Sequence, residues 1–176
     1  MHNNEAVINN QTLYFIGDVH GRLDKLERLL EDLDYHPETA PEYIYGRLVF
    51  VGDLIDNKFI ENVDHQAVLQ RIKSLCDSGY ADCVMGNHEF NAIGWFMRHP
   101  ITDKPLRSHK PSNRKQHGVF LEQVGENSPA HVAWIEWFKT LPLFKDYGHV
   151  RAVHACWHPE WMDQLRPYLN EDNSLK

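Results

Sequence analysis

The sequence predicts an α/β fold in which helices flank a largely parallel β-sheet. Short runs of β-branched and aromatic residues alternate along the chain with longer segments whose apolar residues recur at helical spacing. Several of the short runs are followed at once by glycine and by side chains that bind metals. Because ligands of open α/β sheets gather beyond the carboxyl ends of the strands, this pattern predicts both a fold class and the position of a site.

Four segments are predicted to be buried strands, and the segments between and after them to be helices. The predicted strands cover residues 12–16, 47–51, 81–85 and 149–153. Apolar residues recur every three or four positions over 22–33 and 63–76, then with many aromatics over 120–124 and 132–141, and a further helical pattern spans 159–169. The aromatic faces are expected to belong to the core, and residues 1–176 to form a single domain.

Four blocks of metal-binding residue types follow the four predicted strands. They are Gly17-Asp18-Val19-His20-Gly21, Gly52-Asp53-Leu54-Ile55-Asp56-Asn57, Gly86-Asn87-His88-Glu89 and Val153-His154-Ala155-Cys156-Trp157-His158. Aspartate and histidine suit a transition metal, and asparagine can add a neutral oxygen ligand. One Asp-x-His pair is more often a hydrogen-bonded loop than a ligand pair, whereas four blocks in one chain favour a metal site.

Over about residues 13–159, these blocks resemble the calcineurin-like metallophosphoesterases. The likeness is greatest to the phosphoprotein-phosphatase branch and its bacterial relatives, which include diadenosine-tetraphosphatase-like enzymes. It implies a layered fold with a β-sheet core and a metal site at the carboxyl ends of the strands. It also implies five metal ligands, with Asp18 and His20 on one ion, Asn87 and His154 on the other, and Asp53 on both. His88 would be the proton donor, oriented by Asp56.

Elementary chemistry is consistent with these assignments. Side chains two apart on an extended segment share a face, so Asp18 and His20 can reach one ion. Two divalent ions would activate a water molecule and favour a phosphate dianion. Manganese is the expected metal, although such a site also accepts iron, zinc or nickel. His88 directly follows Asn87 and so points elsewhere, free to act as an acid; Asp56 has the alternative role of a helix N-cap.

The sequence departs from the family pattern in two places. Asn57 and Lys58, the candidate substrate-binding residues, stand where the protein phosphatases have Arg-Gly, so the bidentate grip of an arginine on phosphate is missing there. No histidine follows His158, so the last family ligand is absent. Either the chain lacks a C-terminal part, where the family adds further strands, or another group or water completes the second ion. We expect the domain to be incomplete at its C-terminus and the second ion to be held more weakly.

Residues 98–117 form a basic segment directly after the third block. It carries six Lys or Arg and three His residues against a single acid, Asp103, and its three prolines predict a loop insertion. This loop either holds a polyanionic substrate and replaces the missing arginine, or is a solvated insertion.

Composition excludes some classes of protein. A net charge of −7 argues against a dedicated nucleic-acid binder, and no apolar stretch is long enough to cross a membrane. Three scattered cysteines match neither a disulfide framework nor a zinc ribbon, which favours the cytoplasm.

The function predicted from these observations is hydrolysis of phosphoesters with two divalent ions. A phosphomonoesterase or protein phosphatase is the leading expectation, and a hydrolase of dinucleoside polyphosphates or other nucleotides is the alternative. A catalytically weak metal-binding scaffold is an alternative of a different class. The expected partner is a phosphorylated substrate, which is a phosphoprotein, a nucleotide or a small phosphoester.

Overall fold

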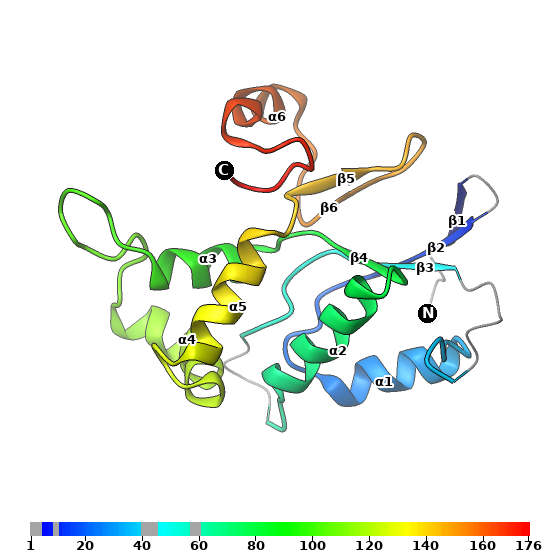
Figure 1. The fold of residues 1–176 in the computed structure, drawn as a ribbon, viewed down its shortest axis with the longest axis horizontal. Coiled ribbons are helices and arrows are strands. Elements are labelled where there is room, and N and C mark those ends of the chain that lie inside the picture. Colours follow the sequence, from blue (N-terminus) through cyan, green and yellow to red (C-terminus); the bar gives the residue numbers. More distant parts are fainter. Residues whose placement is uncertain (1–4, 9–10, 40–45, 57–60) are drawn as a thin grey trace.

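The computed structural model describes residues 5–8, 11–39, 46–56 and 61–176 and has a four-stranded sheet at its centre (Figure 1). The strands lie in the order β1 (Glu5–Ile8), β2 (Gln11–Ile16), β3 (Arg47–Phe50) and β4 (Ala81–Cys83). β2, β3 and β4 are parallel, and β1 pairs antiparallel with β2. Three of the four predicted strands are thereby confirmed in one largely parallel sheet, and β1 is an addition that the sequence did not predict.

Two helices, α1 (Leu23–Asp32) and α2 (His65–Asp77), cover one face of this sheet, the lower face in Figure 1. Both were predicted from the spacing of their apolar residues. Leu26 of α1 and Ile72 of α2 belong to the same buried core as Leu48 and Phe50 of β3. The burial of these apolar side chains is the main favourable term that holds the layers together.

A separate two-stranded antiparallel ladder, β5 (Phe144–Asp146) and β6 (Arg151–Val153), covers the opposite face (Figure 1). Ala152 of β6 packs with Leu13, Val49 and Val84 of the central region. The expectation that all four ligand blocks end strands of one sheet is therefore wrong for the fourth block. Its strand lies in a second layer, and the ladder brings His154 to the site from the other side.

Three helices extend the core beyond the carboxyl ends of the parallel strands: α3 (Asn87–Phe96), α4 (Pro111–Val124) and α5 (Pro129–Lys139). The prediction of a loop over 98–117 is wrong for its second half, because α4 begins at Pro111. Proline is well suited to the first position of a helix, where its missing N–H would have no partner. The predicted helix over 159–169 is α6 (Pro159–Leu165) followed by the 3₁₀ turn η1 (Arg166–Tyr168). No helix within the described residues has the length and apolar character required to span a membrane.

His65, the first residue of α2, is fully buried beneath the first ligand block. Neither of its ring nitrogens has a hydrogen-bond partner among the described residues, and its ring packs against that of Phe120 with 6.1 Å between centroids. Burial lowers the pKa of His65 to about 4, and the neighbouring charge of Asp56 offsets only part of this effect. The folded chain therefore holds His65 in its neutral form.

We expect His65 to make the folded state sensitive to mild acid. The unfolded chain takes up a proton on this side chain below about pH 6.5, whereas the folded chain resists it down to about 4, so stability is lost as pH falls through this window. The contribution between pH 7.5 and 5 is about 2 kcal/mol. Urea unfolding of the chelator-treated protein at both pH values should show a smaller loss in His65→Phe than in wild type. The exposed His149→Gln should behave like wild type, and equal losses in all three proteins would exclude this role for His65.

Candidate metal centre

The backbone of the first two ligand blocks is held in an unusual conformation. His20, Asp53 and Asp56 have φ angles of 49°, 53° and 63°, the left-handed region that residues other than glycine rarely adopt. The amides of Val19 and His20 both donate to the carbonyl oxygen of Asp53, at 3.1 and 3.0 Å. Such strain persists only where the surroundings enforce it, and it is concentrated here in the predicted site.

The buried carboxylate of Glu89 joins the second block to the third. One oxygen accepts from the amides of Asp53 (2.9 Å) and Gly86 (3.0 Å), and the other accepts from Leu54 (2.8 Å) and Ile55 (3.3 Å). Burial and the charge of Asp53 raise the pKa of Glu89, while these backbone hydrogen bonds act in the opposite direction. Glu89 belongs to the third ligand block, but no role was predicted for it, because Asp53, Leu54 and Ile55 lie more than 30 residues away along the chain.

Gly86 permits the close approach of the two blocks. A Cβ atom at this position would overlap with the backbone nitrogen and the carboxylate of Asp53. The glycine is therefore needed for packing, and its φ of −89° is one that any residue can adopt.

Two of the predicted histidine ligands are oriented by backbone carbonyl groups. Nδ1 of His20 donates to the carbonyl oxygen of Ile55 at 2.9 Å, and Nδ1 of His154 donates to that of Val51 at 2.7 Å. When Nδ1 carries the proton of a neutral imidazole, Nε2 carries a lone pair. Each ring is thus held with its free nitrogen as a potential ligand, the arrangement usual for histidines that bind metals.

The atoms around His154 all have lone pairs directed at one another. Its Nε2 lies 2.9 Å from Oδ1 of Asn87 and 3.3 Å from Oδ2 of Asp53. Three such atoms repel one another unless a cation lies among them, either a proton or a metal ion. The geometry therefore fits the donor set of a cation site.

Two groups of side chains could each hold a metal ion, and Asp53 belongs to both. Asp53, which is 5% exposed, groups with His20 and His88 on one side and with Asp18 and His154 on the other. The structure thus brings all the predicted metal ligands to one place. It differs from the prediction in grouping Asp18 with His154 and in placing His88, the predicted acid, with His20. Nε2 of His20 also lies 3.7 Å from the Asp18 carboxylate.

Asp56 lies behind His88 and receives two histidine hydrogen bonds. Nδ1 of His88 donates to one carboxylate oxygen at 3.0 Å, and Nδ1 of His117 donates to the other at 2.7 Å. Burial by itself would raise the pKa of the Asp56 carboxyl, but the two hydrogen bonds outweigh it and lower the pKa. The alternative role as helix N-cap is wrong for α2, since Asp64 occupies that position and accepts from the amide of Ala67 at 2.9 Å.

The surroundings of His88 favour its protonated form. Burial would lower its pKa, but the hydrogen bond with Asp56 and the charge of Asp53 together raise the pKa above its ordinary value. Its Nε2 lies 3.7 Å from the Asp53 carboxylate. Nothing in the sequence indicated His117, which is fully buried and comes from the segment predicted to be a loop.

Three further residues that the sequence analysis singled out are not part of this described cluster. Asn57 and Lys58 fall outside the described residues. His158 is the N-cap residue of α6, and its ring stacks on that of Trp161 with 4.4 Å between centroids. His158 therefore marks the start of a helix.

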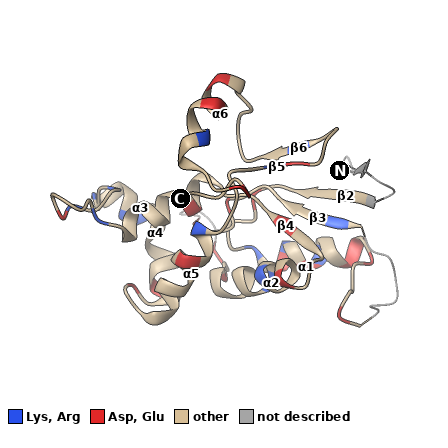
Figure 2. Ribbon diagram, turned by 45° about the horizontal axis from the view of Figure 1, so that its top comes forward, with Lys and Arg blue, Asp and Glu red and all other residues tan. Residues whose placement is uncertain are grey.

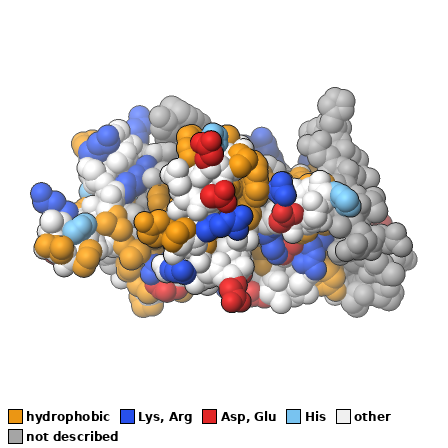
Figure 3. All heavy atoms as spheres, turned by 90° about the horizontal axis from the view of Figure 1, so that it is seen from above, with side chains coloured by type: hydrophobic (Ala, Val, Ile, Leu, Met, Phe, Trp, Pro, Cys, Tyr) orange, Lys and Arg blue, Asp and Glu red, His pale blue; other side chains and the backbone are white. Residues whose placement is uncertain are grey.

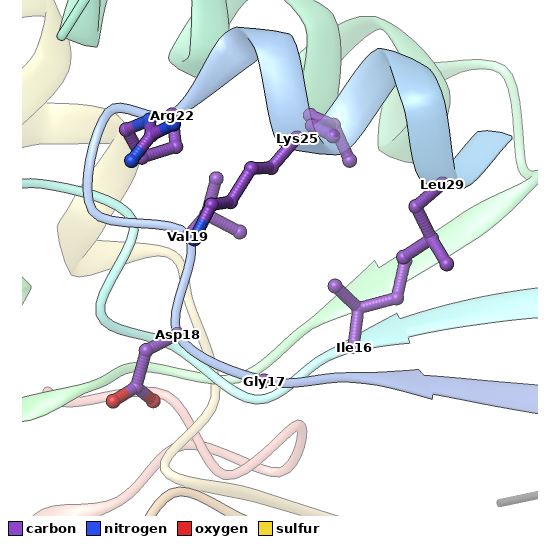
Figure 4. A pocket seen from close by; sticks show the side chains of 8 residues that line it. Ile16, Gly17, Asp18, Val19, Arg22, Lys25 and Leu29 are labelled. Carbon is purple, nitrogen blue, oxygen red and sulfur yellow. The ribbon is translucent and has the colours of Figure 1, made fainter. Parts of the chain in front are cut away.

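Two hollows flank the cluster without containing it. One of about 240 Å³ lies beneath α1, lined in part by Ile16, Arg22 and Lys25, and the Asp18 carboxylate points away from it (Figure 4). Another of about 200 Å³ lies between His154 and α6, and its walls are mainly apolar. The candidate centre itself is at the open ends of the strands.

The α/β layers and the acceptor atoms around Asp53 together define a metal-binding protein with a histidine–aspartate pair beside the centre. A sequence model of the calcineurin-like phosphoesterases matches residues 12–172. The chain therefore belongs to the calcineurin-like phosphoesterase family, hydrolases that act on phosphoester bonds with divalent metal ions. This confirms the resemblance seen in the ligand blocks.

The curated relatives that this chain matches include symmetrical bis(5'-nucleosyl)-tetraphosphatases. The protein from Shewanella sp. (strain MR-7) is 29% identical over 156 residues, which are 87% of this chain and 47% of the relative. That from Haemophilus influenzae (strain PittEE) is 30% identical over 150 residues, 84% of this chain and 45% of the relative. The chain spans about half the length of the curated relatives it matches.

A solved structure has the same fold. It is a crystal structure of a protein proposed to be a diadenosine tetraphosphatase, with a TM-score of 0.50 and 22% identity over 84% of this chain and 51% of the other. This likeness confirms the layered α/β fold of the family.

We expect Glu89→Gln to destabilise the chain by about 2–4 kcal/mol, because each orientation of the amide turns its NH₂ group towards two backbone N–H donors. Chemical unfolding monitored by circular dichroism measures this. Glu122→Gln, the same change at an exposed position of α4, should lie within about 0.5 kcal/mol of wild type. Equal stability of the two variants would show that the carboxylate does not hold the blocks together.

Proposed function

We propose that this chain forms the two-metal centre of a phosphoester hydrolase whose substrate is a dinucleoside polyphosphate or a similar nucleotide. The observation that carries this proposal is the convergence of lone-pair atoms on Asp53 from both sides. The relatives named as tetraphosphatases support the nucleotide alternative over the phosphomonoesterase or protein phosphatase that the sequence first suggested. Because the chain spans about half of those relatives, the activity is proposed for the protein that contains this unit.

The ligand roles follow the blocks. By the family pattern, Asp18 and His20 would hold one ion and Asn87 and His154 the other, with Asp53 shared; the 3.7 Å between His20 and the Asp18 carboxylate and the contact of His154 with Asn87 support these pairs. When bound, two such ions supply Lewis-acid stabilisation of phosphoryl oxygens and an activated water. Manganese is the proposed metal, with iron, zinc or nickel as alternatives for the same donor atoms.

The protein's own acid is His88. Because its Nδ1 is held by Asp56, its Nε2 faces the centre, where it can give a proton to a departing oxygen. His117 donates to the second oxygen of Asp56 and so fixes the carboxylate from behind. Asp56 thus orients His88 and stabilises its charged form.

A second candidate reaction is hydrolysis of alkyl phosphomonoesters, and the His88–Asp56 pair favours it. A positioned acid contributes most where the leaving group is a poor one, as an alkoxide is. Asn57 and Lys58 remain proposed substrate contacts for either reaction. The three cysteines are all free, in agreement with a reducing compartment, and we propose the cytoplasm.

We expect hydrolysis by the manganese-loaded chain to depend on His88 according to the leaving group. His88→Asn should lower kcat on an alkyl phosphate by about 10²–10⁴-fold and on p-nitrophenyl phosphate much less, because a nitrophenolate departs without a proton. Bound manganese, measured by elemental analysis, should equal that of wild type. Diadenosine tetraphosphate is assayed beside both esters to rank the two candidate reactions.

His36→Asn is the matched control, since this histidine lies after the end of α1 and outside the four ligand blocks. Equal losses on the alkyl and aryl esters would assign His88 to positioning, and loss of manganese would assign it to metal binding. Absence of all manganese-dependent hydrolysis in wild type would favour the scaffold alternative.

A further inference from the structure

Arg107 differs from its neighbours in the basic segment between α3 and α4. The Lys and Arg residues of this segment are blue in Figure 2 and lie near the left end of the molecule in Figure 3. Arg98 is exposed and paired with Asp103, and Arg114 is exposed and paired with Glu126. The lysines of the segment are exposed as well. Arg107 is half-buried, and within the described residues it forms no ion pair.

Arg107 is fixed on α3. Its backbone amide donates to the carbonyl oxygen of Gly94 at 2.7 Å, and the amide of Leu106 donates to that of Met97 at 2.9 Å. The backbone of this part of the segment is therefore held against the helix that also carries His88.

The guanidinium group of Arg107 is directed towards the proposed acid. Its Nη2 donates to Oε1 of Gln116 at 2.8 Å, and Nε2 of Gln116 lies 3.4 Å from Nε2 of His88. With Arg107 on the amide oxygen, the NH₂ group of Gln116 lies next to Nε2 of His88, to which it can donate only while that nitrogen carries no proton. The next residue, His117, holds Asp56, so consecutive side chains of α4 contact both members of the His88–Asp56 pair.

One end of this guanidinium has no acceptor. Nη1 of Arg107 is buried and makes no hydrogen bond to any described residue. Burial lowers the pKa of Arg107 and the charge of Asp56 raises it, but an arginine stays protonated in proteins. A buried donor without an acceptor costs free energy, which would be recovered if the guanidinium turned to meet an anion at the centre.

We propose that Arg107, positioned by Gln116, binds a phosphate group carried by the leaving group of the substrate. As the proposed acid, His88 would face the leaving group, and Arg107 lies one side chain beyond His88. A phosphate oxygen can accept from Nη1, whereas an alkyl or aryl leaving group offers no acceptor there. Arg107 would therefore favour polyphosphates over simple phosphomonoesters. This inference rests on the proposed function.

The reaction that Arg107 would serve is a hydrolysis, which consumes one water molecule. In symmetrical cleavage of a dinucleoside tetraphosphate, a water oxygen forms a bond to phosphorus and the central P–O–P bond breaks. The departing oxygen belongs to a nucleoside diphosphate, which retains both of its phosphates, and the second product is the same nucleoside diphosphate. The leaving group thus carries a phosphate beyond the bond that breaks, where Arg107 would meet it.

The test compares two substrates and one ligand in the manganese-loaded chain. For Arg107→Gln, kcat/KM on diadenosine tetraphosphate should fall at least tenfold more than on p-nitrophenyl phosphate. Calorimetric binding of ADP, the leaving group, should weaken about tenfold. Arg107→Lys keeps the charge and loses the planar, two-pronged donor group of the guanidinium, so both its activity and its ADP affinity should lie between those of wild type and Arg107→Gln. Lys104→Gln removes an exposed charge of the same segment and should match wild type in both measurements.

Equal losses on both substrates, with ADP binding unchanged in a folded Arg107→Gln protein, would overturn the proposal. A Lys104→Gln variant that lost as much as Arg107→Gln would overturn it too, because a diffuse field would then explain the effect. If wild type hydrolyses neither substrate, the proposed function fails. ADP binding that depends on Arg107 would still support a phosphate subsite at this residue. ADP binding that does not depend on Arg107 would exclude that subsite.

Discussion

The carboxylate of Glu89 is the interaction on which the rest of the centre depends. By accepting backbone hydrogen bonds from Asp53, Leu54 and Gly86, it fixes the second ligand block against the third. That contact holds Asp53 in its left-handed conformation and sets the start of α3, which carries Asn87 and His88. A buried carboxylate is costly unless its oxygens are satisfied, and here both oxygens accept from the backbone that they organise.

Around the Glu89 carboxylate, hydrogen-bond acceptors and donors lie on different sides of the centre. Asp18, His20 and His154 bring lone-pair atoms towards Asp53, which suit cations. On the far side of His88, α4 brings Gln116 and, behind it, the donor Arg107. A phosphate chain between bound cations and a guanidinium would be met by positive charge along its length. The segment richest in positive charge in the sequence thus acts, in this account, through a single oriented side chain.

The sequence predicted most of the centre because strand ends and ligand spacing are local features. Glycine-bounded blocks after the runs ending at Ile16 and Phe50 placed Asp18 and Asp53 correctly at one sheet edge. Sequence analysis failed where the role of a residue depends on contacts with residues far away in the chain. His117 reaches Asp56 across 61 residues, and periodicity cannot show that β6 lies in a second layer. α4 was not predicted because its first residues belong to a highly charged segment, although Pro111 is a normal first residue of a helix.

The central claim is that Asp53 is shared by two ions, and the most direct measurement is the number of manganese ions bound per chain. Elemental analysis of equilibrated protein should find two ions in wild type, one in His20→Ala and close to none in Asp53→Asn. The two single substitutions serve as controls for each other, because each removes one proposed ligand from the same backbone cluster. Two ions retained by a folded Asp53→Asn protein would contradict the claim.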